Sequence, residues 1–365
     1  MTLNKEPILS VQDLVVKFKV RDRILTAIRN VSLDLNEKET LAIVGESGSG
    51  KSVLTKTFTG MLDSNGYIDQ GHIVYNGQDL MELKRNKDWE KIRGTQIATI
   101  FQDPMTSLNP IRTIGSQITE VIVKHQKKSN VEAKREAIEL MGRTGIVDAA
   151  KRFNDYPFEY SGGMRQRIVI AIALACHPKI LICDEPTTAL DVTIQAQILD
   201  LIKSLQKDYG FTTIYITHDL GVVASVADKV AVMYAGQIVE YGTVDEIFFD
   251  AKHPYTWSLL SSLPQLGVKG EELYSIPGVP PSLYHEVKGD AFAPRNPYAM
   301  EIDFEEEPPF FSVSATHAAK TWLLDPRAPK VEMPEEIRDL DQKMKALVKR
   351  NGIYKHLSKG EDSDE

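Results

Sequence analysis

Apolar and polar positions alternate along the N-terminal part of the chain in the way that half-buried β-strands require. The alternation occupies three segments, Ile8–Val11, Leu14–Val20 and Val31–Leu35, and the last of them ends in the polar turn 36–39. A continuous apolar run, Leu41–Val44, follows directly and is typical of a strand buried on both faces. The pattern predicts a small antiparallel layer that leads into a buried strand.

Beyond this strand, segments with helical spacing are interleaved with short apolar segments that predict further strands. The helical segments are 53–61, 114–146, 168–176 and 193–205. The predicted strands are 71–77, 97–101, 180–183, 211–217, 230–234 and 237–240. Ser129 and Glu132 have the spacing of a capping box, and Gly142 and Gly145 end the helical stretch that follows. This order of elements indicates an α/β fold with an inserted helical layer.

A glycine-rich loop joins the buried strand Leu41–Val44 to the first helical segment. It fits the pattern G-x-x-x-x-G-K-[ST], and its residues are Gly45, Glu46, Ser47, Gly48, Ser49, Gly50, Lys51 and Ser52. Glycines let successive backbone N–H groups surround phosphate oxygens at a helix N-terminus, where the helix dipole favours an anion. We expect Lys51 to reach the β- and γ-phosphates and the Ser52 hydroxyl to bind Mg²⁺. The loop predicts a nucleoside triphosphate site.

Polar side chains suited to phosphate chemistry follow several of the predicted elements. Asp184 and Glu185 end the buried strand 180–183, and acids at the carboxyl end of a parallel strand lie near ligands in α/β sheets. Gln102 follows the strand 97–101, where on its own it is read as an ordinary loop amide. The other candidates are the turn Ser161, Gly162 and Gly163, then Asp191, His218 and the upstream aromatic residue Phe18, which either stacks on a nucleobase or packs in the core.

Composition narrows the classes of function. The chain has 365 residues, with 43 Lys and Arg against 51 Asp and Glu, a net charge of 43 − 51 = −8 that argues against a general nucleic-acid surface. Cys176 and Cys183 both lie in apolar segments, which indicates packing residues and not a disulfide or zinc site. No apolar run approaches the ~18 to 20 residues of a membrane span, and we expect no signal peptide and a cytoplasmic chain, unless a partner holds it elsewhere.

These motifs, in this order, closely resemble those of the nucleotide-binding subunit of ATP-binding cassette (ABC) transporters, over about residues 8 to 250. The turn Ser161–Gly163 resembles the signature motif of this family, and we call it the signature turn. It departs slightly from the commonest form, with Tyr160 in place of leucine and Met164 in place of glutamine. The resemblance implies a P-loop NTPase (RecA-like) core with an antiparallel β subdomain and an inserted α-helical subdomain. It implies an ATPase domain over residues 1–250, with the helical subdomain at about 110–178.

The resemblance also implies roles for the residues around the nucleotide. Lys51 and the loop amides would hold the β- and γ-phosphates of ATP. Ser52 and Gln102 would coordinate Mg²⁺, and Asp184 would support the metal. Asp191 belongs to the same nucleotide-binding set.

Hydrolysis and dimerisation are implied by the remaining motifs. Glu185 would polarise the attacking water as general base, and His218 would contact the γ-phosphate. Phe18 would be the adenine-stacking ring. In this family two subunits dock head to tail, so Ser161–Gly163 would cap the ATP held by a second subunit.

The same resemblance implies partners in the membrane. Without a span of its own, the chain would pass its work to two separate membrane permease subunits, with the loop Pro104–Pro110 as the contact next to Gln102. The resemblance to prokaryotic importers implies a heterodimer with a second, similar ATPase, an extracellular peptide-binding protein, and a peripheral location on the cytoplasmic face of the membrane. No nucleic-acid partner is expected.

A proline-dense segment, 251–334, follows the ATPase domain and is similar to the C-terminal region of the ATPases of oligopeptide and dipeptide importers, most like the D-type subunit. Many relatives carry cysteines there that can hold an iron–sulfur cluster. This chain has Asp290, Asn296 and Asp303 at the corresponding-looking positions, so no such cluster is expected. Over 335–365 we expect an amphipathic helix that docks on this or the partner subunit, and then an acidic tail.

The sequence therefore predicts an ATPase subunit that powers the import of oligopeptides. Within the same class, the cargo is alternatively a dipeptide, nickel or another solute. A soluble, non-transport ABC ATPase is disfavoured, because the chain has neither a second cassette nor a long coiled coil between the phosphate loop and the signature turn. A non-hydrolysing ATP-binding module is disfavoured because Glu185 and His218 are both present.

Overall fold

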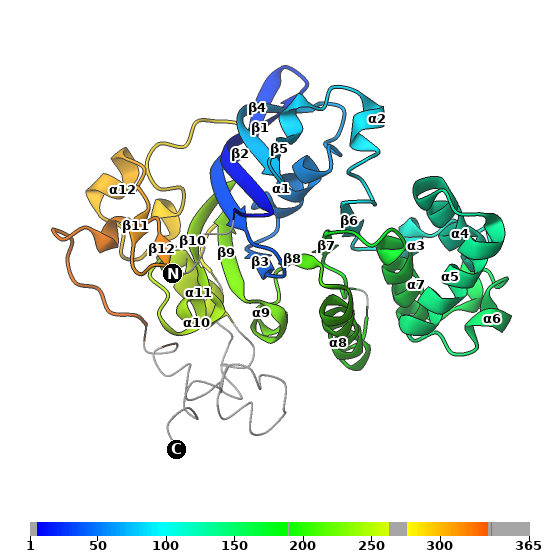
Figure 1. Cartoon of the computed structure of the whole chain (residues 1–365). Coiled ribbons are helices and arrows are strands. Elements are labelled where there is room, and N and C mark those ends of the chain that lie inside the picture. Colours follow the sequence, from blue (N-terminus) through cyan, green and yellow to red (C-terminus); the bar gives the residue numbers. More distant parts are fainter. Residues whose placement is uncertain (1–5, 189, 263–275, 335–336, 338–365) are drawn as a thin grey trace.

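The computed structural model describes residues 6–188, 190–262, 276–334 and 337 (Figure 1). An antiparallel sheet of four strands in the order β2-β1-β4-β5 forms one layer. Its strands are β1 (Leu9–Val20), β2 (Arg23–Leu35), β4 (Gly66–Tyr75) and β5 (Gln78–Asp79). The two strands predicted over 8–20 are one strand, because a bulge at Asp13, which has a φ of 48°, shifts the pairing register without ending the ladder.

A second sheet of eight strands runs in the order β11-β12-β10-β9-β3-β8-β7-β6. Its strands are β3 (Thr40–Val44), β6 (Ile97–Ile100), β7 (Ile180–Asp184), β8 (Thr212–Thr217), β9 (Lys229–Tyr234), β10 (Gln237–Thr243), β11 (Phe311–Ser312) and β12 (Ala318–Ala319). The strands from β6 to β9 are parallel, whereas β10, β12 and β11 extend the sheet antiparallel to them. The parallel strands bring their carboxyl ends to one edge, where ligands bind in sheets of this type.

Helices cover this sheet and form a separate layer. The α-helices are α1 (Lys51–Phe58), α2 (Asn86–Trp89), α3 (Pro104–Ser107), α4 (Ile114–Gln126), α5 (Asn130–Arg143), α6 (Ala149–Arg152), α7 (Gly162–Leu174), α8 (Val192–Tyr209), α9 (Leu220–Val226), α10 (Val244–Phe249), α11 (Pro254–Ser261) and α12 (Glu301–Glu305). Short 3₁₀ turns are η1 (Leu80–Glu82), η2 (Pro157–Glu159), η4 (Ala293–Arg295) and η5 (Trp322–Leu324). Among the described residues, no helix is long and apolar enough to cross a membrane.

The inserted helical layer contains α3 to α7 and lies at one end of the molecule, on the right in Figure 1. The helical stretch predicted over 114–146 is two helices, because the chain turns at Lys127 with a φ of 57° before α5 begins. The predicted capping box is confirmed: Ser129 accepts from the Glu132 N–H, and the Glu132 carboxylate accepts from the Ser129 N–H. The fold expected from the sequence, an α/β core with an antiparallel β layer and a helical insertion, is confirmed.

The described residues of the C-terminal region, 251–262 and 276–334, lie at the end of the molecule opposite the helical layer, on the left in Figure 1. Its strand β12 pairs with β10, and the buried rings of Tyr255 and Phe292 share one core cluster with Ala42 and Val44 of β3. The described residues of the proline-dense segment are therefore an integral part of the fold. The helix predicted over 335–357 lies outside the described residues, apart from Ile337, which is buried in the same cluster.

Candidate functional site

The glycine-rich loop lies between β3 and α1, at the carboxyl edge of the parallel strands. Gly45 has a φ of 150°, and a Cβ at this position would come within 2.0 Å of the Met233 carbonyl oxygen. Only glycine therefore lets the loop leave β3 this close to β9. The Leu54 N–H donates to the Gly50 carbonyl, so the loop turns directly into the first turn of α1. This is the strand, loop and helix arrangement that holds phosphate groups.

Lys51 lies inside the loop with 7% of its surface exposed. Its ammonium group donates to the carbonyls of Gly45 and Glu46, each over 2.8 Å, and to the Ser49 hydroxyl over 3.4 Å. Burial lowers the pKa of Lys51, and nearby carboxylates, first that of Glu185, oppose this change. The loop therefore holds a compact positive charge at its centre.

Ser52 connects the loop to the strand β7. Its hydroxyl donates to Asp184 Oδ1 over 3.2 Å. Burial raises the pKa of Asp184, while the hydrogen bond from Ser52 lowers it in part. The two residues place a hydroxyl and a carboxylate oxygen side by side, and hard divalent cations prefer such oxygen ligands.

Glu185 is the centre of a group of polar side chains from three strand ends. Gln102 Nε2 donates to its Oε2 over 2.8 Å, the Thr188 hydroxyl donates to the same oxygen over 2.9 Å, and His218 Nδ1 lies 2.9 Å from Oε1. Burial by itself raises the pKa of Glu185, but the hydrogen bonds from His218 and Thr188 outweigh it and the pKa is lowered. Glu185 is therefore a carboxylate at neutral pH.

The backbone at Glu185 is unusual for a residue with a side chain. Its φ is 46°, in the left-handed region, and its N–H donates to the Ile216 carbonyl of β8 over 2.9 Å. A residue other than glycine in the left-handed region is strained, and the surrounding structure must offset this strain. Such residues are often found at functional sites. The strand β7 thus turns sharply at its end and presents the carboxylate to Gln102 and His218.

The signature turn belongs to the helical layer. Ser161 is the N-cap of α7 and accepts from the Met164 N–H, while a Cβ on Gly163 would come within 2.7 Å of Ile194 Cγ2. Asp191 caps the neighbouring helix α8 by accepting from the Ile194 N–H over 3.0 Å. Figure 1 shows α7 away from α1, so within one chain Ser161–Gly163 and the phosphate loop lie apart.

Phe18 lies in β1 and is 9% exposed. Its ring packs over Gly66, where a Cβ would come within 2.6 Å of it, and Phe18 pairs with Leu25 across the antiparallel layer. This burial leaves little of the ring face open in this structure. Adenine stacking by Phe18 stays a prediction.

The sequence reasoning did not identify three contacts to these residues. Thr188 is three positions from Glu185, but threonine in a turn carries no signal of a carboxylate partner. Tyr255 accepts a hydrogen bond from the Glu46 N–H, and Arg295 pairs with the Glu46 carboxylate. Both of these residues belong to the C-terminal region and lie more than 200 positions after Glu46 in the sequence, so no local pattern could have indicated them.

Three acidic or amide residues occupy the place considered for an iron–sulfur cluster, and each is part of a local turn. Asp290 accepts from the Phe292 N–H, Asn296 from the Tyr298 N–H, and Asp303 from the Met300 N–H. Among the described residues, no group of three or more His, Cys, Asp and Glu side chains is arranged for a metal ion. The two cysteines are free, and burial raises the pKa of Cys176 to about 11 and that of Cys183 further.

Two family models match the chain. Residues 28–188 match the model described as "ABC transporter", and residues 239–302 match the model described as "Oligopeptide/dipeptide transporter, C-terminal region". The first range includes the phosphate loop, the signature turn and Glu185. The second includes Tyr255 and Arg295.

Curated proteins are similar over nearly the whole chain. The oligopeptide transport ATP-binding protein AmiE of Streptococcus pneumoniae is 71% identical over 345 residues, which cover 94% of this chain and 97% of that protein. The oligopeptide transport ATP-binding protein OppD of Bacillus subtilis is 59% identical over 91% of this chain and 93% of its own length. The dipeptide transport ATP-binding protein DppD of Lactococcus lactis is 58% identical, with 91% and 95% covered.

Solved structures share the fold of the cassette. The ATP-binding cassette MJ0796, solved as a dimer in a post-hydrolysis state bound to ADP and Pi, has a TM-score of 0.58 at 26% identity and covers 65% of this chain and 98% of its own. The protein cbiO1 of Clostridium perfringens, part of the ABC transporter complex cbiONQ, has a TM-score of 0.58 at 29% identity, with 67% and 91% covered.

Proposed function

The chain belongs to the ABC transporter family, and from this membership we propose that it is the ATP-hydrolysing subunit of an oligopeptide importer. The observation that carries the proposal is the Glu185 group, in which Gln102 and His218 from two other strand ends, together with Thr188 from the following turn, hold one ionised carboxylate beside the phosphate loop. The names of the relatives, which are oligopeptide and dipeptide transport ATP-binding proteins, support peptides as the cargo.

ATP and Mg²⁺ fit the residues of the loop edge. Lys51 and the N-terminus of α1 supply positive charge for the phosphates. The Ser52 hydroxyl, the Asp184 carboxylate and the Gln102 amide oxygen would hold Mg²⁺, which prefers oxygen ligands and binds with substrate phosphates. Burial raises the pKa of Asp184, and a cation would stabilise its charged form. The ion would neutralise charge on the phosphates during hydrolysis.

Glu185 has the chemistry to orient and polarise the attacking water. An ionised carboxylate has about four lone-pair positions, and three donors occupy part of them, which leaves room for a water. The donors fix the direction of the carboxylate, and positioning is the main requirement of phosphoryl transfer to water. His218 then links this carboxylate to the place of the γ-phosphate, and the products are ADP and phosphate.

A second ATPase subunit completes each ATP site in the proposed assembly. Ser161–Gly163 lies at the N-terminus of a helix of 13 residues, where backbone N–H groups and the dipole attract an anion, but it is separated from the loop of its own chain. The dimer reported for MJ0796 supports this arrangement by analogy. We favour a heterodimer with a similar ATPase, in which Ser161–Gly163 serves the ATP of the partner.

The proposed location is the cytoplasmic face of the membrane, where two permease subunits receive the work of the dimer and an extracellular peptide-binding protein delivers the cargo. The loop Pro104–Pro110, which follows Gln102, contains the short helix α3 and is the proposed contact with the permeases. The next residue, Ile111, is strongly exposed (82%). A displacement of Gln102 at the γ-phosphate would move this loop. Nucleotide binding and the membrane contact would thus share one segment.

The test compares two variants in purified protein and in peptide uptake by cells. Glu185→Gln should bind ATP like the unaltered chain and lose turnover by about 10²- to 10⁴-fold, because it removes the charge that polarises water. Glu139→Gln, which alters an exposed glutamate of α5 paired with Arg143, is the matched control and should keep both activities. Peptide uptake should fall with ATPase activity. Unaltered turnover in Glu185→Gln would contradict the assignment of Glu185, and unaltered uptake would remove peptides as the cargo.

A further inference from the structure

Glu46 is an acidic residue within a loop whose other features attract anions. Each of its polar groups has a partner: the N–H donates to the Tyr255 hydroxyl over 2.8 Å, the carbonyl accepts from Lys51 Nζ over 2.8 Å, and the carboxylate pairs with Arg295. A carboxylate close to a triphosphate repels it unless a cation neutralises the charge. Because Glu46 lies in this loop, we expect the charge on its carboxylate to influence ATP binding.

Arg295 holds this carboxylate at two points. Nη1 donates to Oε2 over 2.7 Å and Nη2 donates to Oε1 over 3.0 Å. The side chain of Arg295 is 4% exposed and that of Glu46 is 27% exposed, so solvent screens the pair only in part. A two-point contact between guanidinium and carboxylate fixes direction as well as charge, which a lysine cannot do.

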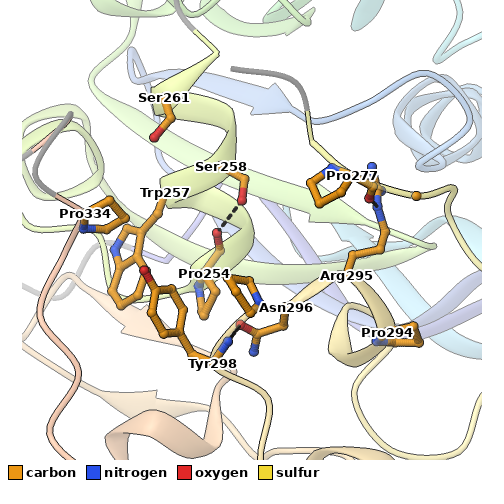
Figure 2. Close-up of a pocket in the computed structure, with 12 residues that line it drawn as sticks. Pro254, Trp257, Ser258, Ser261, Pro277, Pro294, Arg295, Asn296, Tyr298 and Pro334 are labelled. Atoms are coloured by element: carbon orange, nitrogen blue, oxygen red, sulfur yellow. Dashed lines mark hydrogen bonds between the residues drawn. The ribbon is translucent and has the colours of Figure 1, made fainter. Parts of the chain in front are cut away.

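The C-terminal region and Tyr234 of β9 together hold the guanidinium of Arg295 in place from several sides. Its Nε donates to the Pro277 carbonyl over 2.7 Å, and Nη1 also donates to the Tyr234 hydroxyl over 3.1 Å. The guanidinium carbon lies 5.7 Å and 5.8 Å from the ring centroids of Tyr234 and Phe292. Figure 2 shows Arg295 beside Pro277 at the wall of a cavity of about 500 Å³ that Trp257 also lines. Arg295 is thus pre-arranged to meet the loop.

We propose that Arg295 is a positioning residue for the nucleotide site: it neutralises Glu46 and fixes its carboxylate, so that the C-terminal region sets the affinity of the loop for ATP. The role rests on the proposed function, because it requires the loop to bind ATP. The proposal means that residues of the oligopeptide/dipeptide transporter C-terminal region act directly on the phosphate loop, which belongs to the ABC transporter domain.

A set of charge variants in the full chain tests this role, with the dissociation constant of a fluorescent ATP analogue as the readout. Arg295→Gln leaves Glu46 charged and unpaired, and should weaken ATP binding about tenfold. Glu46→Gln removes the repelling charge, and should weaken ATP binding clearly less than Arg295→Gln does. The double variant Glu46→Gln, Arg295→Gln should return to within about threefold of the unaltered chain, since neither charge is left.

A purely structural role of Arg295 predicts a different result. Arg295→Gln would then lower the Tm without nucleotide, and Glu46→Gln would not restore ATP binding. The matched control is Arg327→Gln, because Arg327 also makes a two-point contact, with Asp325 over 2.8 Å and 2.9 Å, but lies at an exposed site of the C-terminal region. This control should bind ATP like the unaltered chain. If Arg295→Gln does not fold, Arg295→Lys, which keeps the charge and loses the two-point contact, should still weaken ATP binding measurably.

Two outcomes would overturn the role: ATP binding by Arg295→Gln equal to that of the unaltered chain, or a double variant that binds as weakly as Arg295→Gln. Lys51→Ala separates this failure from a failure of the proposed function. If the unaltered chain binds ATP and Lys51→Ala does not, the nucleotide site stands and only the role of Arg295 is wrong. If neither binds ATP, the proposed function itself is wrong.

Discussion

The hydroxyl of Tyr255 is the second contact between the C-terminal region and the phosphate loop, and its removal gives a measurable prediction. Tyr255 is fully buried, and its hydroxyl accepts from the Glu46 N–H over 2.8 Å. Tyr255→Phe deletes only this oxygen. The ring contacts with Tyr234 and Phe292, at centroid distances of 4.5 Å and 5.3 Å, should stay in place. The variant therefore tests the hydrogen bond without a change in ring packing.

The expected cost follows from the N–H that is left without a partner. A buried donor without an acceptor costs about 1–3 kcal/mol. Because the contact between Glu46 and Tyr255 is partly buried, we expect the free energy of unfolding to fall by about 1 kcal/mol, the lower end of this range. The Glu46 carbonyl also accepts from the Lys51 ammonium group. Greater backbone motion at Glu46 should therefore shift the position of this ammonium group. We expect ATP binding to weaken about two- to tenfold, which corresponds to at most about 1.4 kcal/mol.

Urea unfolding and titration with a fluorescent ATP analogue measure the two effects separately. Tyr241→Phe is the matched control, because the Tyr241 hydroxyl donates to the Asp34 carbonyl over 3.4 Å in a place away from the loop. The control should lose at most a little stability and bind ATP normally. A Tyr255→Phe variant that is destabilised but binds ATP with unaltered affinity would refute the reasoning, since the contact would then hold the fold together without reaching the site.

Two further predictions concern hydrolysis and pH. His218→Ala removes the group 2.9 Å from Glu185 Oε1, and in phosphate-release assays it should lower turnover by about 10²-fold or more while ATP binding is kept; unaltered turnover would contradict the role of His218. Burial raises the pKa of Glu246, but hydrogen bonds, first from Ser314, outweigh it and lower the pKa to about 2 from 4.5. Because the pKa of Glu246 is lower in the folded state, its carboxylate stabilises the fold above pH 4.5, by about 1 to 2 kcal/mol after screening by solvent. This contribution is lost as the pH falls from 4.5 toward 2. Acid titration of the unfolding free energy should show a smaller loss in Glu246→Gln, and an equal loss would contradict this account.

Much of the fold follows from local sequence pattern. The capping box at Ser129, the buried strand before the loop and the acids at the end of β7 are each set by residues within a few positions of one another, and the structure has them where the pattern predicts them. The bulge at Asp13 was not predicted, because an alternating pattern that shifts by one position looks like two strands. The strands β11 and β12 have two residues each, too few to carry any periodicity.

The surroundings of the candidate site depend on contacts that sequence pattern does not record. The order of strands in the large sheet places β6 beside β7 and β7 beside β8, and only this order brings Gln102 and His218 to Glu185. The φ of 46° at Glu185 likewise has no local signal, since neither glycine nor asparagine marks the position. The pairing of Glu46 with Arg295 joins residues 249 positions apart. Candidate residues were thus visible in the sequence, while their partners required the fold.

The strand β3 explains why the C-terminal region and the phosphate loop depend on each other. Successive side chains of a strand point to opposite faces, and β3 uses both. Leu41 and Ile43 pack into the cluster shared with the antiparallel layer, whereas Ala42 and Val44 pack into the cluster that holds Tyr255 and the rest of the C-terminal core. The residue after Val44 opens the loop. Helix α9 also packs on this face of β3, so removal of the C-terminal region would take away part of the core on that face and both contacts at Glu46. We therefore expect ATP affinity and the packing of this region to change together.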